Sequence, residues 1–504
     1  MTSEMLQKAR DYESQYHKYA DPERPRFHVT GQLGWINDPN GFSSYKGEYH
    51  LFFQYHPYRT IWGPMHWGHV KTKDFVKWEY LPCAMAPDTD ADRNGCFSGS
   101  AIEMPDGNQL LMYTGVYWKM IEDGTREEHQ HQCIAIGDGV NYEKYEENPV
   151  LGSKDLPEGA SKLDFRDPHI FKLGDKYYSV VGNRPADGSG SLLVFESQDA
   201  LHWSYKCLLD ACYNEFGRMW ECPDFFEVDG KHVIFVSPQE MAPMGLEFHA
   251  GYGTVALIGS FDEETFKFER EHVQAIDYGI DFYAPQVVKT YDGRQVMIAW
   301  MENWTNTNSK FERNRLFGAM TLPRELHVRE DGRLIQTPVR EIANYYGRKV
   351  AYDNVVILKE MNLAGVQGRY LDMTVSVRPM GSNGYEWFKM YLAKDGEHNV
   401  MVRYKPHTNV VKIDRSRCGG RFDIVHTREI IVRPRNGEIK FRVIMDGNLV
   451  ELFVNDGEQA ISFKLYNKTM DAKAISFEAD QAVVINVVKH DIVVDGNWSH
   501  AEEV

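Results

Sequence analysis

Ile170-Phe-Lys-Leu-Gly174 and, directly after it, Tyr177-Tyr-Ser-Val-Val181 form the stretch that decides the fold. Apolar and aromatic residues fill both runs, and a tight Gly-Asp turn separates them, which is the sequence signal of a β-hairpin. The same order of apolar strand, glycine turn and second apolar strand occurs five times before residue 300. The turn glycines are Gly47, Gly107, Gly174, Gly230 and Gly293, at intervals of 60, 67, 56 and 63 residues.

A second marker repeats in phase with the hairpins. An aspartate followed four residues later by an aromatic residue occurs at Asp74/Trp78, Asp138/Tyr142, Asp199/Trp203 and Asp262/Phe266, with aspartates 64, 61 and 63 residues apart. Two independent markers with one period indicate a repeat in which each all-β unit buries a face against the next. Five such units predict a five-bladed β-propeller.

The repeats stop after Pro338, and the pattern changes to alternating strands separated by turns such as Asp446-Gly447. Alternation of this kind is typical of an antiparallel β-sandwich. We therefore expect an all-β protein with four parts. They are an N-terminal extension at 1–25, a propeller that forms the catalytic domain at 26–338, a linker helix at 339–347 and a β-sandwich at 348–504.

Composition excludes several classes of partner. Lys and Arg number 56 against 73 Asp and Glu, which gives a formal charge of −17. A chain this acidic is unsuited to nucleic acid or to an anionic membrane surface, because both need basic protein surfaces. Residues 1–26 contain no apolar run typical of a secretory signal, and seven scattered cysteines form no Cys-x-x-Cys pair. We expect a cytoplasmic protein with free thiols; the sequence gives no indication of an oligomeric state.

Carboxylates lie at equivalent places in three repeats. Asp38 and Glu221 each precede a hairpin glycine by nine residues, and Asp167 precedes one by seven. Ser98 and Ala284 hold these positions in the other two repeats. Since the innermost strands of a propeller line its channel, these positions converge at one mouth. Each motif alone could be an ordinary turn, but three crowded carboxylates suit glycoside hydrolysis, where one carboxyl attacks and another protonates the leaving oxygen.

Four motifs then resemble those of glycoside hydrolase family 32, the β-fructofuranosidases. They are Trp35-Ile-Asn-Asp-Pro-Asn-Gly41, Phe97-Ser-Gly-Ser100, Arg166-Asp-Pro168 and Glu221-Cys222, and the resemblance extends beyond Asp456 in the sandwich. It implies a propeller followed by a sandwich, and an enzyme that releases fructose from sucrose, sucrose 6-phosphate or short fructo-oligosaccharides.

The resemblance also implies a role for each carboxylate. Asp38 would be the nucleophile, Glu221 the general acid and then base, and Asp167 the residue that stabilises the oxocarbenium-like transition state. Polar donors around Asp38 favour its ionised form, and the apolar and acidic neighbours of Glu221 favour the protonated form that an acid needs. We expect retention of configuration, with the two carboxyl groups about 5–5.5 Å apart.

Eight further residues match substrate contacts of the family. They are Asn37, Gln54, Trp62, Phe97, Ser98, Arg166, Tyr283 and Trp300. Trp62 and Trp300 adjoin the motif strands, and we expect them to face the sugar, because aromatic rings suit its apolar face. Trp78 and Trp203 repeat with the blades and are expected to pack in the core.

Two charged segments leave alternatives open. Lys310, Arg313 and Arg315 form a basic cluster that could bind a phosphate or be a solvated loop. The segment 88–95 resembles the start of a calcium loop but has Arg93 where that loop needs glycine, so we expect no metal. No cofactor is expected either.

Three functions remain open. The leading hypothesis is a retaining β-fructofuranosidase; the others are a fructosyltransferase on the same scaffold and a carbohydrate-binding propeller without turnover.

Overall fold

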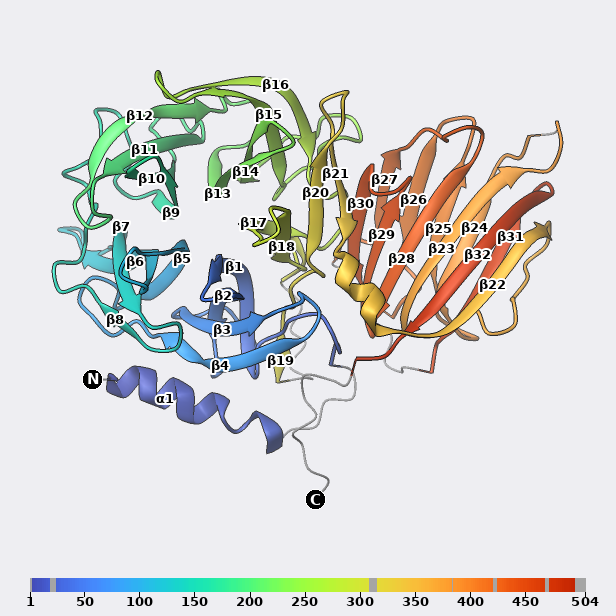
Figure 1. The fold of residues 1–504 in the computed structure, drawn as a ribbon, viewed down its shortest axis with the longest axis horizontal. Helices are drawn as coiled ribbons and strands as arrows, with labels where there is room; N and C mark the ends of the chain where they lie inside the picture. The colour runs from blue at the N-terminus through green and yellow to red at the C-terminus, as the bar shows by residue number, and fades with distance from the viewer. Residues whose placement is uncertain are drawn as a thin grey trace.

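The computed structural model describes residues 2–18, 24–307, 315–382, 384–419, 424–466 and 471–494. The chain forms two β domains side by side, a ring of sheets and a layered pair of sheets (Figure 1). The prediction of an all-β propeller followed by a β-sandwich is confirmed. Among the helices in these ranges, none is long and apolar enough to cross a membrane.

Five sheets surround the central axis of the first domain (Figure 1). The first sheet has the order β19 (Leu316–Phe317), β1 (Gly34–Tyr45), β2 (Glu48–His56), β3 (His66–Thr72), β4 (Trp78–Met85). The second has the order β5 (Gly95–Glu103), β6 (Gln109–Met120), β7 (Arg126–Gly137), β8 (Tyr142–Lys144). The third, from inside to outside, is β9 (Phe165–Leu173), β10 (Lys176–Asn183), β11 (Ser191–Ser197), β12 (Ser204–Ala211). The fourth has the order β13 (Met219–Val228), β14 (Lys231–Gln239), β15 (Val255–Asp262), β16 (Lys267–Ala275). The fifth has the order β17 (Tyr283–Lys289), β18 (Gln295–Trp300), β20 (Arg324–Val328), β21 (Leu334–Pro338).

Both sequence markers have a local structural cause. Each repeat glycine turns the first strand of a sheet into the second with a positive φ, from 58° at Gly174 to 86° at Gly293, a region that glycine adopts without strain. Each repeat aspartate lies before the outermost strand, where its carboxylate accepts backbone N–H groups of the turn, as Asp199 does from Leu201 and His202 at 2.9 Å. The innermost strands β1, β5, β9, β13 and β17 each pack against the next, and β17 packs against β1, so the ring is closed.

The N-terminal segment packs against the first sheet. Helix α1 (Glu4–Glu13) begins at Ser3, whose hydroxyl accepts the Leu6 N–H, and buries Leu6 and Ala9. Glu13 accepts the backbone N–H of Cys83 in β4 at 2.6 Å. A 3₁₀ turn, η1 (Tyr16–Lys18), follows α1.

The second domain is a sandwich of two antiparallel sheets. A 3₁₀ helix, η3 (Arg340–Tyr345), connects it to the propeller. One sheet has the order β22 (Tyr346–Ile357), β32 (Val483–Ile492), β23 (Tyr370–Pro379), β28 (Ile439–Asp446), β29 (Leu449–Val454), β30 (Gln459–Lys464). The other has the order β27 (Thr427–Ile431), β26 (Val410–Asp414), β25 (Val400–Lys405), β24 (Phe388–Lys394), β31 (Ala474–Ala479).

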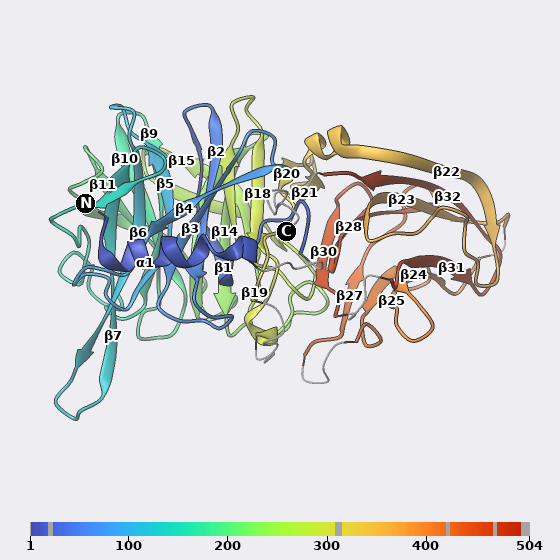
Figure 2. The same cartoon turned by 90° about the horizontal axis from the view of Figure 1, so that it is seen from below.

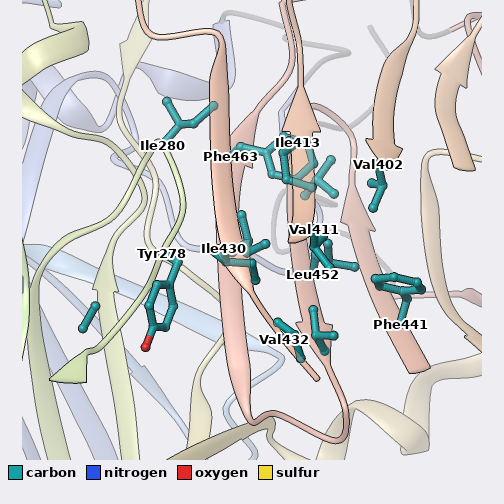
Figure 3. Packing of buried hydrophobic residues seen from close by; sticks show 14 of the residues in the cluster. Tyr278, Ile280, Val402, Val411, Ile413, Ile430, Val432, Phe441, Leu452 and Phe463 are labelled. Atoms are coloured by element: carbon teal, nitrogen blue, oxygen red, sulfur yellow. The ribbon is translucent and has the colours of Figure 1, made fainter. Parts of the chain in front are cut away.

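The hydrophobic core of the sandwich continues into the propeller. Figure 3 shows Tyr278 and Ile280, which follow β16, beside Phe463 of β30 and Ile430 of β27. All four belong to one cluster of buried side chains. Apolar burial of this extent is the main force that holds two domains in one arrangement.

A fully buried charge network crosses the same interface. Arg324 of β20 pairs with Asp277 at 2.9 Å and with Glu451 of β29 at 2.5 Å. His28 places one ring nitrogen 2.9 Å from Asp446 and the other 2.8 Å from Glu451. Burial opposes the charged imidazole, but these two carboxylates outweigh it and raise the pKa of His28 to about 9. His28 is therefore a cation that links the start of the propeller to the sandwich.

Stability should fall as this histidine loses its proton. Because the folded-state pKa lies above the ordinary 6.5, the stabilisation is complete below pH 6.5 and is lost as pH rises through about 9. We expect the Tm of the wild type to fall between pH 6.5 and 9.5. The variant His28→Gln breaks a buried ion pair, which should lower the free energy of unfolding by about 3–5 kcal/mol at pH 6. The fall of its Tm with rising pH should be shallower than that of the wild type. Thermal unfolding across the pH range measures both, with the exposed His407→Gln as control. Parallel declines in wild type and His28→Gln would contradict the assignment.

Candidate active site

Every innermost strand of the propeller carries a β-bulge near its start. The register with the second strand shifts by one residue at Asn37–Asp38 in β1, Ser98 in β5, Asp167–Pro168 in β9, Cys222–Pro223 in β13 and Ala284–Pro285 in β17. A bulge bends its strand and turns a side chain away from the ordinary alternation. The five bulges therefore aim side chains of five strands at one mouth of the channel.

Local sequence explains where the bulges form. Proline lacks the N–H that a regular ladder needs, so it is suited to bulges. Three prolines, Pro168, Pro223 and Pro285, lie within them. The residue before each has a positive φ, which is 64° at Asp167, 47° at Cys222 and 51° at Ala284. Cys222 rather than Glu221 is thus the structural equivalent of Asp167, and Glu221 is the equivalent of Arg166 and Tyr283.

The side chains at the second of these equivalent positions contact one another. Arg166, Glu221 and Tyr283 meet directly: the Arg166 Nη2 lies 3.0 Å from Glu221 Oε1, and the Tyr283 hydroxyl lies 2.7 Å from Glu221 Oε2. That hydroxyl is also 2.9 Å from the Ser237 carbonyl. It can donate to an ionised Glu221, or donate to the carbonyl and accept from a protonated Glu221. Tyr283 therefore fits both states of a group that gives and takes a proton.

Asp38 and Asp167 meet around Cys222. The Cys222 N–H donates to Asp167 Oδ2 at 2.9 Å, and its sulfur lies 3.6 Å from both Asp167 Oδ2 and Asp38 Oδ2. Ser98 donates to Asp38 Oδ2 at 3.1 Å. The other oxygen, Asp38 Oδ1, is buried and has no hydrogen-bond partner among the described residues. Ser98 thus fixes one oxygen of the Asp38 carboxylate, and the other oxygen is enclosed by the protein.

Burial and mutual repulsion change the acidity of the aspartates. Burial, then the charges of Glu221 and Asp167, raise the pKa of Asp38 to about 7, although hydrogen bonds from Asn37 and Ser98 act the other way. Burial also raises the pKa of Asp167 to about 6, against the opposing charge of Arg166. Polar donors therefore favour the ionised form of Asp38, as expected, but burial and the neighbouring carboxylates outweigh them. Both charges that act most strongly on Asp38 are carboxylates, while Arg166 contacts Glu221.

A cavity of about 290 Å³ opens above the three carboxylates. Nine of the eleven predicted site residues line it: Asn37, Asp38, Gln54, Trp62, Phe97, Ser98, Arg166, Asp167 and Glu221. Trp62 is 44% exposed and meets the Phe97 ring edge-to-face at 5.8 Å, so it forms an aromatic rim. A larger hollow at the opposite end of the innermost strands, bounded by residues such as Phe42 and Phe225, contains none of the predicted site residues.

Two predicted contacts lie beneath the cavity instead of lining it. Trp300 is fully buried, and its ring packs at 6.0 Å from Trp35 and 5.0 Å from Trp304. A side chain in that position supports the floor of the site and does not match the expected sugar-facing role. Tyr283 is also fully buried, and its contact is with Glu221.

The cavity is also lined by six residues that were not predicted from the sequence: Glu128, Gln130, Asp164, Gln239, Tyr252 and Trp304. Trp304 begins a 3₁₀ turn, η2 (Trp304–Asn306), and Asn303 donates to the Tyr252 carbonyl at 3.0 Å, so these two aromatic residues are held together. Asn306 bonds Asp281 at 3.0 Å and accepts the Val425 N–H from the sandwich at 3.1 Å. The one sequence signal for Glu128 and Gln130 as cavity residues is the alternation of side chains along β7, which places both on one face of the strand.

The other reactive or charged features are the Cys222 thiol, the calcium-like segment and the basic cluster. Burial raises the pKa of the Cys222 thiol, so it is not a nucleophilic thiolate. In the calcium-like segment, the Lys144 ammonium lies 2.5 Å from both Asp88 and Asp92, where a cation would be expected. Within the described ranges no cluster of three or more metal-ligating side chains occurs. Lys310 and Arg313 of the basic cluster lie outside the described residues.

Comparison with protein families and with known relatives identifies the family of this chain. Residues 28–338 match the glycosyl hydrolases family 32 N-terminal domain, and residues 341–493 match the C-terminal domain of that family. A sucrose-6-phosphate hydrolase of Zymomonas mobilis is 34% identical over 94% of this chain and 93% of its own length. A raffinose invertase of Escherichia coli is 33% identical over 90% of this chain and 92% of its own.

Solved structures give the same result. A Bombyx mori GH32 beta-fructofuranosidase mutant in complex with sucrose superposes with a TM-score of 0.82 at 29% identity, covering 97% of this chain and 98% of that one. The sucrose-6-phosphate hydrolase from Lactobacillus gasseri gives a TM-score of 0.83 at 28% identity, covering 97% and 96%. The resemblance found in the motifs is confirmed: this chain belongs to glycosyl hydrolase family 32.

Proposed function

We propose that the protein is a retaining β-fructofuranosidase that releases fructose from the non-reducing end of sucrose-type substrates. The observation that carries the proposal is the convergence of Asp38, Asp167 and Glu221 on one small cavity. Membership of the family and the sucrose complex of the Bombyx mori relative support the substrate class.

In the first step, the Asp38 carboxylate attacks the anomeric carbon of the fructosyl unit. The bond from that carbon to the leaving oxygen breaks, and Glu221 transfers its proton to this oxygen. Ser98 donates a hydrogen bond to the Asp38 carboxylate and orients it, and Tyr283 switches from accepting to donating as Glu221 becomes a carboxylate. The product is a fructosyl ester on Asp38 and a free sugar.

In the second step, Glu221 removes a proton from water. The water oxygen forms a bond to the anomeric carbon, and the bond to Asp38 breaks, which restores the starting carboxylate. Two displacements on opposite faces give net retention. Asp167, fixed by the Cys222 N–H at 2.9 Å, is placed to bind ring hydroxyls and to stabilise positive charge in both transition states.

The site fits small substrates and an exo mode of attack. A cavity of about 290 Å³ lies at the lower end of the ~300–1,000 Å³ usual for ligand sites, enough for one terminal sugar with its leaving group toward solvent. Sucrose, sucrose 6-phosphate and short fructo-oligosaccharides meet this condition. All seven cysteines are free thiols, six of them buried, which favours a reducing cytoplasm, where such imported small sugars are found.

Turnover of sucrose and sucrose 6-phosphate tests the proposal. The wild type should release glucose, or its phosphate, and fructose in equal amounts, and Asp38→Asn should lose at least about 10³-fold in kcat. A phosphate preference above about 100-fold would make the basic cluster a candidate phosphate site. Fructose release well below glucose release would indicate transfer to a sugar acceptor. No turnover of either substrate, or full activity of Asp38→Asn, would contradict the proposal.

The pH dependence of sucrose hydrolysis tests the nucleophile independently. Below its raised pKa of about 7 Asp38 is protonated and cannot attack, so kcat/KM should fall on the acid side with an apparent pKa near 7. Asp167→Asn removes a repelling charge and should move this limb to lower pH. Ser98→Ala removes a hydrogen bond to the carboxylate and should move it to higher pH. A limb that stays in place in both variants would rule out Asp38 as its source.

A further inference from the structure

The longest hairpin of the propeller extends beyond the ring. Strands β6 and β7 pair without interruption from Gln109↔Gly137 to Met120↔Arg126. In Figure 2 the outer part of this ribbon, labelled β7, projects from the propeller on the side where β19 lies. Its outer part exposes large apolar side chains, with Trp118 at 40% and Met120 at 61%.

Strand alternation decides which side chains of the ribbon face the catalytic cavity. Glu128 and Gln130 of β7 line that cavity. Since side chains two residues apart share a face, Arg126 lies on it too, and so do the cross-strand partners of these residues. The pairs are Val116↔Gln130, Trp118↔Glu128 and Met120↔Arg126.

Contacts between side chains agree with this assignment. The Trp118 indole nitrogen lies 3.4 Å from Glu128, and the Arg126 guanidinium lies 5.2 Å from the Trp118 ring. The other face of the ribbon holds a separate stack, in which Tyr117 lies between His129 and His131 at 5.1 Å from each ring. The face with Trp118 is therefore continuous with the wall of the active site.

The backbone of Trp118 is fixed to the neighbouring loop. Its N–H donates to Asn94 Oδ1 at 2.9 Å, and its carbonyl lies 3.3 Å from Arg93 Nη2. Successive residues on one face of a strand are about 7 Å apart, so Trp118 and Glu128 form the rim and Arg126 lies one step further out. An exposed indole, a carboxylate and a guanidinium thus occupy a fixed place directly outside the cavity.

We propose that Trp118, Glu128 and Arg126 form an outer subsite for the third sugar unit of a trisaccharide. The indole would stack on the apolar C–H face of the sugar, while the carboxylate and the guanidinium would bind its hydroxyls. The inference rests on the proposed function and extends it: the leaving group that this subsite favours is a disaccharide. Sucrose has a leaving group of only one sugar, so it fills the cavity and does not reach the outer subsite.

Kinetics with a disaccharide and two trisaccharides test the subsite. kcat/KM for sucrose, raffinose and 1-kestose is measured for the wild type, Trp118→Ala, Trp118→Phe and Lys119→Ala. We expect Trp118→Ala to lower the value about 10-fold for the trisaccharides, mainly through KM, and less than 2-fold for sucrose. Trp118→Phe should keep most of the trisaccharide rate. Lys119, next in sequence but on the other face, is the matched control and should change neither.

Equal losses on all three sugars would overturn the proposal, because they would indicate that Trp118 only supports the cavity wall. No loss on any sugar would overturn it as well. Binding to the Asp38→Asn protein separates this inference from the proposed function. Calorimetric titration should give raffinose a higher affinity than sucrose, and Trp118→Ala in that background should remove the difference. This result stands even if the wild type hydrolyses neither sugar, whereas equal affinities would refute the subsite.

Discussion

The active site depends on one backbone constraint, the β-bulge that each of the five innermost strands carries at the same end of the channel. A closed ring of strands alone would bury these positions in regular ladders. The bulges instead turn Asp38, Ser98 and Asp167 toward a common centre and place Glu221 against Arg166. Catalytic geometry therefore results from the frame of the propeller, which is rigid because every innermost strand packs on two neighbours.

This convergence brings three carboxylates close together, where they repel one another. The neighbouring groups offset this repulsion to a different degree for each carboxylate. Arg166 contacts Glu221 at 3.0 Å and lies 4.0 Å from Asp167, while Asp38 is held by neutral donors. The resulting high pKa of Asp38 links catalysis to pH. The sandwich contributes from outside, since Val425 binds Asn306 and thereby fixes the turn that carries Trp304 into the cavity.

Much of this could be predicted from the sequence, because the hairpin glycines and turn aspartates repeat with the blades. Counting from those glycines found Asp38, Asp167 and Glu221, yet it aligned Glu221 with Asp38, whereas the bulges make Cys222 the equivalent of Asp167. Trp300 shows a second limit, since nearness to a motif strand does not reveal which face of that strand a side chain takes. Tyr252 and Trp304 lie in irregular connections between blades, and only tertiary contacts place them.

Trapping the covalent intermediate tests the central claim, that Asp38 is the nucleophile, most directly. An aryl β-fructofuranoside, whose leaving group needs no proton, is mixed with Glu221→Gln, which lacks the base for the second step. After acid quench and peptic digestion, mass spectrometry should find a hexosyl adduct on the peptide that contains Asp38, and none in the Asp38→Asn, Glu221→Gln double variant. An adduct on the Asp167 peptide, or aryl release without any adduct, would contradict the account.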